Sequence, residues 1–204
     1  MGFYRDFILP RGVDKALAGE EHEALRKRAT AKLSGRVLEI GFGSGRNLAY
    51  LPEGVERVEA VEPAKGARKI ALPRIEACRA DVSFAGETAE DVKLADGSVD
   101  CALSTWSLCS VPDPVRGLAE IRRVLVPGGR FHFLDHGLAP DPKVARWQRR
   151  LEPLQRLLFG GCKLKLPIAA MIRDAGFEIE SLETFYMPGP KFSSYMYLGV
   201  ARID

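Results

Sequence analysis

The sequence lacks any hydrophobic run approaching the roughly 20 residues that a membrane span needs. Its first residues also lack the hydrophobic stretch of a secretory signal peptide, so we expect a cytoplasmic protein. No cysteines are spaced as C-x-x-C; the four lie scattered at Cys78, Cys101, Cys109 and Cys162. This spacing favours neither a zinc site nor disulfides, and no metal ion is expected.

An excess of charge of one sign is also missing. Thirty Lys and Arg against 27 Asp and Glu give a net charge of +3, which does not by itself indicate a nucleic-acid ligand. No repeat, low-complexity tract or linker divides the 204 residues, a length that suits one domain with a substantial core. We therefore expect one domain over 1–204, with an N-terminal arm and helix at 1–35, a ligand-binding core at 36–136 and substrate-side elements at 137–204.

The most informative segment is an apolar run that leads into an acid and three glycines. The pattern E-x-G-x-G-x-G predicts a buried strand, a tight turn and a helix that begins near Asn47, with its motif residues at Glu39, Gly41, Gly43 and Gly45. Glycine tolerates positive φ, and such a turn directs free backbone N–H groups at a ligand. A dinucleotide site would have its third glycine at position 46, where this chain has Arg46. Glu39 would repel a pyrophosphate but could pair with an ammonium group, and a purely structural turn is the alternative.

Strand-like and helix-like segments alternate after this turn. Strands are predicted at 36–40, 55–62, 81–86, 99–104 and 130–135, with helices between them. Helices at 143–160 and 167–175 and strands at 178–186 and 192–202 follow, whereas an irregular arm at 1–13 and a helix at 14–33 precede the first strand. The alternation indicates an α/β fold with a wound parallel sheet.

Glu62 ends the second predicted strand and is followed by Pro63. It lies 21 positions after Gly41, close to the spacing of about 20 at which an acid reaches ribose hydroxyls in wound sheets. Its two oxygens can accept from both hydroxyls, although a solvated acid at a strand end is the simpler interpretation.

Three motifs in order resemble class I S-adenosylmethionine (SAM) methyltransferases over residues 36–136. They are the glycine segment, the Ala-Glu-to-Asp-Gly-Ser segment at 89–98 and the helix end that runs into Pro-Gly-Gly at 127–129. The resemblance implies a Rossmann-like, doubly wound, mixed seven-stranded sheet with an antiparallel last strand and helices on both faces. It also implies that SAM is bound and S-adenosylhomocysteine released. The cofactor would be held by Glu39, Gly41, Gly43 and Gly45 at the methionine end, by Glu62 at the ribose and by Thr88, Ala89 and Glu90 at the adenine. Asn47, Pro63, Thr105 and Trp106 are expected beside the cofactor, with Trp106 either shielding the sulfonium, covering the pocket or serving in packing.

Methyl transfer is a direct displacement, so the protein mainly aligns the nucleophile and removes water. Substrate-contacting residues are expected at the carboxyl ends of strands four and five, which includes Leu108 and Cys109. Asp135 and His136 are the candidate catalytic pair: His136 could take a proton from a thiol or hydroxyl, or be a structural histidine satisfied by its neighbours.

A closer resemblance is to the methyltransferase-like 7 group of membrane-anchored animal thiol S-methyltransferases. It rests on Leu-Cys-Ser-Val at 108–111, on Trp147 and on Leu-Phe-Gly-Gly-Cys at 158–162. It implies a small apolar thiol as substrate, with His136 near the sulfur and Trp147 on the substrate side. The group's N-terminal anchor is not expected in this chain.

Other functions remain open at the level of sequence. The basic amphipathic helix at 143–160 could lie on an anionic membrane surface and serve a lipid or quinone precursor, or could be a solvated face. A SAM-binding regulator without catalysis is a further alternative. A nucleic-acid substrate is not expected, because no Asn/Asp-Pro-Pro-Tyr-type motif follows the fourth strand. The sequence does not specify an oligomeric state.

Overall fold

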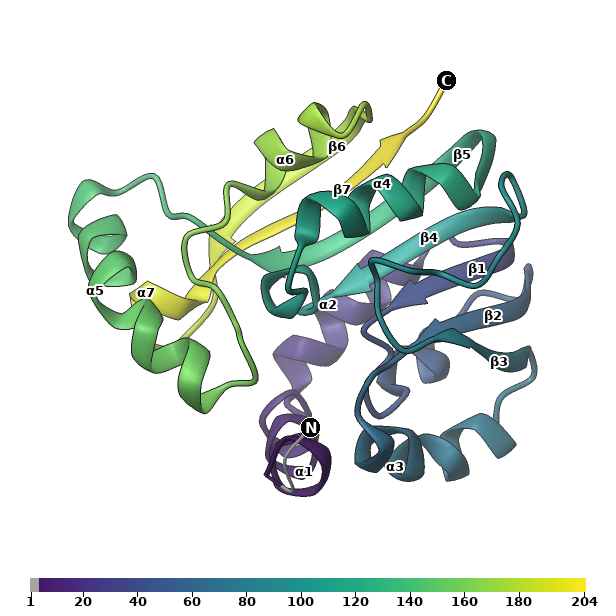
Figure 1. Cartoon of the computed structure of the whole chain (residues 1–204), viewed down its shortest axis with the longest axis horizontal. Coiled ribbons are helices and arrows are strands. Elements are labelled where there is room, and N and C mark those ends of the chain that lie inside the picture. Colours follow the sequence, from purple (N-terminus) through teal and green to yellow (C-terminus); the bar gives the residue numbers. More distant parts are fainter. Residues whose placement is uncertain (1–3) are drawn as a thin grey trace.

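A single seven-stranded sheet forms the centre of the computed structural model, which describes residues 4–204 (Figure 1). The strand order is β3-β2-β1-β4-β5-β7-β6, and β7 alone runs in the direction opposite to the other six strands. This arrangement confirms the mixed sheet expected from the sequence. The strands are β1 Gly35–Ile40, β2 Val55–Val61, β3 Asp81–Gly86, β4 Val99–Thr105, β5 Leu125–His136, β6 Glu178–Tyr186 and β7 Tyr195–Arg202.

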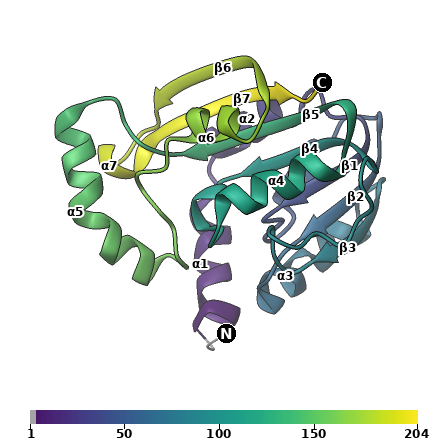
Figure 2. The same cartoon turned by 45° about the horizontal axis from the view of Figure 1, so that its top comes forward.

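Helices cover both faces of the sheet and produce two hydrophobic cores (Figures 1 and 2). Leu118 and Ile121 of α4 and Ile172 of α6 pack in one core, whereas Leu25 of α2 and Ala71 of α3 pack in the other. Burial on both faces explains why the strands read as nearly continuous apolar runs. The helices are α1 Leu9–Ala16, α2 Glu20–Thr30, α3 Lys65–Glu76, α4 Pro114–Val124, α5 Pro142–Leu158, α6 Ile168–Asp174 and α7 Lys191–Ser194.

Three short helical segments complete the order of elements. A π-helix, η1, spans Tyr4–Ile8, and two 3-10 helices, η2 and η3, span Arg46–Tyr50 and Leu108–Ser110. Both 3-10 segments follow the carboxyl end of a strand, η2 after β1 and η3 after β4. They therefore lie at the edge where a wound sheet binds its ligand.

The position of that edge follows from the strand order. The chain winds outward from β1 through β2 to β3 and then returns to β4 on the other side of β1. The ends are level, since Ile40 of β1 pairs with Val61 of β2 and with Ser104 of β4. The loops after β1 and β4 consequently part at this point and leave a crevice.

The N-terminal segment differs from the sequence prediction. The described part of the predicted arm is helical, as η1 and the first half of α1, while residues 1–3 lie outside the described residues. The single helix predicted at 14–33 is two helices, α1 and α2, separated at residues 17–19. Gly19 precedes α2 in an extended conformation, which ends one helix and starts the next.

Two later strands also start at residues other than those predicted. β5 starts at Leu125 rather than at 130, with the irregularity of its pairing to β4 between Val99 and Cys101. The last strand starts at Tyr195, because residues 191–194 form the short helix α7. Among residues 4–204, no helix is both long and apolar enough to pass through a bilayer.

Candidate active site

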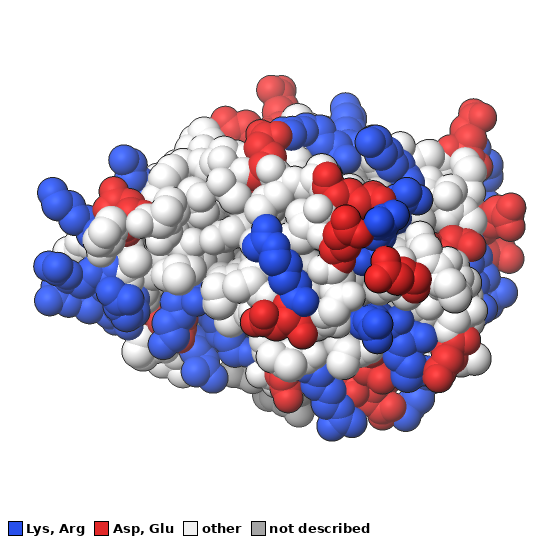
Figure 3. Space-filling view, turned by 90° about the horizontal axis from the view of Figure 1, so that it is seen from above, with Lys and Arg blue, Asp and Glu red and all other residues white. Residues whose placement is uncertain are grey.

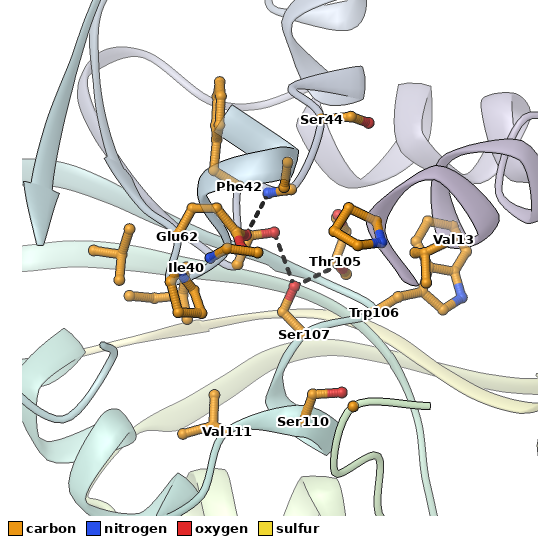
Figure 4. A pocket seen from close by; sticks show the side chains of 18 of the residues that line it. Val13, Ile40, Phe42, Ser44, Glu62, Thr105, Trp106, Ser107, Ser110 and Val111 are labelled. Carbon is orange, nitrogen blue, oxygen red and sulfur yellow. Dashed lines mark hydrogen bonds between the residues drawn. The ribbon is translucent and has the colours of Figure 1, made fainter. Parts of the chain in front are cut away.

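A cavity of about 490 Å³ lies at the carboxyl ends of β1, β2 and β4 (Figure 4). The glycine turn and Glu62 line one side, and Trp106, Ser107 and Ser110 after β4 line another. Residues from α1 and from the end of α5 complete the wall. The cavity is therefore bounded by a helix near the start of the chain, by the end of α5 and by loops at the centre of the sheet.

The glycine turn has the backbone conformation that its sequence predicts. Gly41, Gly43 and Gly45 all have positive φ, between 57° and 74°. At Gly41 a side chain is excluded for a second reason, since a Cβ would lie 2.2 Å from Oγ of Ser107. The loop after β4 thus approaches the turn where no side chain intervenes.

Glu62 is held by the backbone on either side of it. One of its carboxylate oxygens accepts from the N–H of Gly43 at 2.8 Å, and the other accepts from the N–H of Ala64 at 2.8 Å. Burial raises the pKa of Glu62, while these two N–H groups and the nearby Arg68 oppose the rise. Each oxygen has a second lone pair, so the fixed carboxylate can still accept from a ligand in the cavity.

A buried polar network lies beneath the turn. Asn47 donates to Oε1 of Glu39 at 2.8 Å and to Oγ1 of Thr105 at 2.9 Å. Nη1 of Arg26 donates to Oδ1 of Asn47 at 2.8 Å and to Thr105 at 3.2 Å. Four separate elements, β1, η2, β4 and α2, are joined through these contacts.

The network contains one acid and one base with unusual pKa values. Burial raises the pKa of Glu39 to about 7, against the hydrogen bond from Asn47 and the charge of Arg26. Burial lowers the pKa of Arg26 to about 10, partly opposed by Glu39. Oε2 of Glu39 and Nε of Arg26 are buried without a partner. Arg26 lines the cavity, whereas Glu39 and Asn47 lie behind its wall.

Trp106 occupies a strained position at the end of β4. Its φ of 50° is in the left-handed region, and its N–H donates to the carbonyl of Leu134 at 2.7 Å. The Arg26 guanidinium lies over its ring at 4.8 Å, and the His22 ring lies 5.3 Å away. A non-glycine residue keeps such a conformation only when its surroundings fix it, which is common at functional sites.

Helix α1 is fastened to the glycine turn by Asp14. Asp14 accepts hydrogen bonds from Ser44, from Arg46 at 2.8 Å and from Arg74 at 3.1 Å. Burial alone would raise the pKa of Asp14, but these three partners hold it below its usual value. The exposed cavity face of α1 and the residue after it contribute apolar side chains, namely Leu9, Pro10, Val13 and Leu17.

Asp135 is fully buried and holds the loop after β4. It accepts from the N–H groups of Ser107 at 3.0 Å, Leu108 at 2.9 Å and Cys109 at 3.4 Å. Burial raises the pKa of Asp135, while the charge of His136 and these N–H groups oppose the rise. These contacts start η3 and fix the cavity wall that carries Trp106 and Ser110.

His136 points away from the cavity wall toward a cysteine. Its Nε2 lies 3.1 Å from Sγ of Cys162, and its Nδ1 is buried without a partner. Burial would lower the pKa of His136, but the contacts with Cys162 and Asp135 raise it above its usual value. Cys109, His136 and Cys162 are all buried and form one cluster.

At the far end of the cavity, Glu90 organises the segment after β3. One of its oxygens accepts from the N–H of Asp113 at 2.8 Å, and the other accepts from the Thr88 hydroxyl. Ala89 is buried, and Gly117 of α4 packs close to its Cβ. Thr88, Ala89 and Glu90 of this segment all line the cavity.

The structure brings most of the predicted cofactor residues together. Nine line the cavity, namely Gly41, Gly43, Glu62, Pro63, Thr88, Ala89, Glu90, Thr105 and Trp106. Seven other predicted site residues do not line it. Three belong to the predicted cofactor set, namely Glu39, Gly45 and Asn47, and four to the predicted substrate and catalytic sets, namely Leu108, Cys109, Asp135 and His136.

Trp147 is separated from this group. It is on the outer surface of α5, 54% exposed, and lines a smaller apolar groove with Val144, Leu151, Pro190, Lys191 and Phe192. The structure therefore gives it no contact with the cavity.

Sequence reasoning missed the residues that precede the glycine turn in the chain. Arg26 and the cavity face of α1 reach the site only through tertiary packing. Asp14 carried no distinguishing signal, because Glu20, Glu21 and Glu23 follow it in the same segment. Ser107 and Ser110 carry no motif of their own.

The cavity fits the cofactor that the sequence resemblance implies. The carboxylate oxygens of Glu62 are acceptors of fixed orientation beside the glycine turn. A side chain at Gly41 of this turn would collide with Ser107. A buried arginine lines the same cavity, where it can receive a carboxylate. No phosphate-binding pattern is needed for such a ligand.

Comparison with known proteins agrees with this geometry. The methyltransferase domain family matches residues 38–133. Human thiol S-methyltransferase TMT1A is 36% identical over 165 residues, which cover 78% of this chain and 66% of that protein. A demethylmenaquinone methyltransferase of Clavibacter sepedonicus is 32% identical over 120 residues, 58% of this chain and 49% of that protein. The chain spans about two thirds of the length of the thiol methyltransferases that it matches.

Solved structures show the same fold. A SAM-dependent methyltransferase from Methanosarcina mazei superimposes with a TM-score of 0.67 at 21% identity, over 83% of this chain and 92% of that chain. The order of the strands, the glycine turn, the cavity and the matched sequences lead to one conclusion. The chain belongs to the class I SAM-dependent methyltransferases.

Proposed function

We propose that this protein transfers the methyl group of SAM to a small apolar acceptor, and that the acceptor is a thiol. The observation that carries the first part is the fixed Glu62 carboxylate beside the glycine turn. The similarity to thiol S-methyltransferases supports the second part.

Each end of the cofactor has a matching group in the cavity. Glu62 and Pro63 receive the ribose, and Thr88, Ala89 and Glu90 receive the adenine. Arg26 offers its remaining donors to the carboxylate of the methionine end, while the glycine turn receives the ammonium group, with the buried carboxyl of Glu39 behind it. SAM itself supplies an activated methyl group on a positively charged sulfur, and the protein supplies alignment and exclusion of water.

The acceptor enters beside Trp106, where the walls are apolar. Leu9, Val13 and Phe159 line this part of the cavity together with the hydroxyl of Ser110. A small apolar thiol buries its carbon chain here and needs little help from a base, because a thiol titrates near 8.5 in water. His136 lies one layer behind and would act on the acceptor only through an intervening group.

Cofactor binding is the first test. Calorimetric titration with SAM, S-adenosylhomocysteine and NAD(H) should show binding of the two sulfur compounds alone. Glu62→Ala should weaken SAM binding at least about tenfold, because two hydrogen bonds to a charged acceptor are lost. Glu56→Ala is the matched control, since Glu56 is an exposed residue of β2, the strand that Glu62 directly follows. Equal affinity of the two variants would refute the site.

Methyl transfer to a series of alkyl thiols, phenols and quinols then tests the acceptor. Turnover with thiols alone supports the proposal, and turnover with quinols alone replaces it. Tight SAM binding without turnover on any acceptor would favour a SAM-binding regulator instead.

A second candidate, an acceptor drawn from a membrane surface, is favoured by α5. Leu154, Leu157, Leu158 and Phe159 at its end are between 44% and 70% exposed. Lys and Arg side chains gather at the end of the molecule where α5 lies (Figure 3). An apolar strip flanked by basic side chains suits an anionic bilayer surface, and the strip reaches the cavity at Phe159.

Vesicle sedimentation separates this candidate from the first. If α5 binds membranes, Leu157→Glu should reduce binding to vesicles of phosphatidylserine and phosphatidylcholine by severalfold. Val115→Glu is the control, because Val115 is 64% exposed on α4, away from the strip. No sedimentation of the unaltered protein with these vesicles would leave α5 as a solvated face.

A further inference from the structure

Cys109, His136 and Cys162 meet in the interior although they are far apart in sequence. Cys109 lies in η3 after β4, His136 ends β5, and Cys162 follows α5. One ligand atom from each lies within 4.8 Å of the other two, and all three residues are buried. Within residues 4–204 this is the one cluster of His, Cys and carboxylate groups with the spacing of a metal site.

The separations are close to those of a tetrahedral metal centre. Zn–S bonds of about 2.3 Å and Zn–N bonds of about 2.0–2.1 Å place neighbouring ligand atoms roughly 3.5–3.8 Å apart. Nε2 of His136 and Sγ of Cys162 are already 3.1 Å apart. A shift of a few tenths of an ångström therefore opens the cluster enough for an ion.

Backbone contacts hold the cysteine segments in place independently of any ion. The N–H of Lys163 donates to the carbonyl of Cys109 at 2.8 Å, which joins the two segments directly. Asp135 fixes the start of η3, as described above. On the other side, buried Glu152 of α5 accepts from the N–H groups of Leu164 at 3.1 Å and Lys165 at 3.2 Å. The ligands are thus preorganised, which lowers the cost of binding.

The tautomer of His136 follows from which of its ring nitrogens would bind the ion. Nδ1 of His136 is buried and has no hydrogen-bond partner, and the contact of Nε2 with Sγ of Cys162 at 3.1 Å is compatible with either tautomer. In a cluster of two thiols and an imidazole, a bound cation would fix it, because Nε2 then ligates and the proton stays on Nδ1.

We propose that Cys109, His136 and Cys162 form a binding site for a soft divalent metal ion, with zinc as the ion that this ligand set selects. Two cysteines and one histidine leave a fourth position for water or another small ligand, as in zinc sites with an open coordination position. Each thiol gives up its proton to solvent when the metal binds.

A metal ion at this site would stabilise the wall of the cavity. Ser110 follows one ligand directly, and Phe159 and Gly160 precede another by a few residues; all three line the cavity. A metal ion would fix these wall segments against the end of β5. This proposal contradicts the expectation of no metal ion. That expectation used only the spacing of the cysteines along the sequence, which does not report residues that meet through folding.

Cobalt substitution tests the site in the full-length protein. Reduced protein, freed of metal by a chelator, is titrated with Co²⁺ and then with Zn²⁺. We expect one equivalent of Co²⁺ to bind, with the sulfur-to-cobalt absorption of thiolate ligation, and Zn²⁺ to displace it. Cys109→Ser and Cys162→Ser should lose this absorption, while Cys78→Ser, at a half-buried cysteine outside the cluster, should keep it.

Two checks keep the result interpretable. Binding of S-adenosylhomocysteine by each variant shows that it is folded, independently of metal and of methyl transfer. Absence of thiolate absorption in the folded, reduced, unaltered protein would overturn the proposal. Absorption that persists in both cluster variants would also overturn the proposal. The same holds if Cys109 and Cys162 form a stable disulfide in preference to binding metal.

Discussion

At the scale of single residues, the buried acid Glu39 gives the protein an unusual dependence on pH. Its pKa in the folded protein is raised by burial to about 7, whereas the ordinary value is 4.5. The folded state therefore holds a proton that the unfolded chain releases, and stability attributable to this group falls as pH rises from 4.5 to 7. Above pH 7 the loss is complete.

Glu39→Gln should remove this part of the pH dependence. The amide keeps an oxygen for Asn47 but carries no charge. The free energy of unfolding of the variant should therefore exceed that of the unaltered protein, and by more at pH 8 than at pH 5. Urea unfolding at the two pH values measures the difference, with Glu56→Gln as an exposed control. A difference that does not change with pH would contradict the raised pKa. The substitution should at the same time weaken SAM binding if Glu39 pairs with the ammonium group.

Residue types at the ligand edge were largely predictable because each has a local reason. Glycines at 41 and 43 and the acid at 62 follow strands directly, and a strand end fixes where the next residues point. Arg26 was not predictable, since it reaches Thr105 only through the packing of α2 against the sheet. Asp135 was recognised as important at its strand end, but its contacts with three N–H groups are visible only in the fold.

At the scale of elements, the N-terminal segment depends on one close backbone approach. A Cβ on Gly66 of α3 would lie 1.9 Å from the carbonyl oxygen of Asp6 in η1, and backbone cannot yield as a flexible side chain does. Gly66 thus permits η1 and α1 to pack on α3. The sequence predicted an arm here because Pro10 and Gly12 are poor helix formers, and tertiary packing outweighed that preference.

Gly66→Ala should therefore displace η1 and α1 and leave the sheet intact. We expect faster amide hydrogen exchange over residues 4–17 and SAM affinity reduced severalfold, because α1 covers the cavity. Gly12→Ala is the matched control, as a Cβ at Gly12 meets no atom within 4 Å. Unchanged exchange in Gly66→Ala would show that the segment is held in another way.

At the scale of the whole molecule, a ligand in the central crevice should stabilise all layers together. Binding to the folded state alone adds about 2.7 kcal/mol at a ligand concentration of 100 Kd. For a domain of this size that corresponds to a rise in Tm of roughly 5–10 °C. Scanning calorimetry with saturating S-adenosylhomocysteine measures it, and NAD(H) at equal concentration is the negative control.

The architecture as a whole could be predicted because its rules are general. Alternating apolar strands and helices specify a wound sheet, and the motif order matched a family with a mixed last hairpin. The meeting of Cys109, His136 and Cys162 could not be predicted, because it depends on where three loops converge. Spacing in the sequence reports local geometry only.

The place of β7 has a consequence for how the protein is made. It pairs with β5 on one side and β6 on the other, yet it is synthesised after both. Until β7 emerges from the ribosome, β5 presents an open edge of unpaired N–H and C=O groups to other nascent chains, the kind of edge that promotes aggregation. The late synthesis of β7 therefore sets how long this edge of β5 stays unpaired in the growing chain.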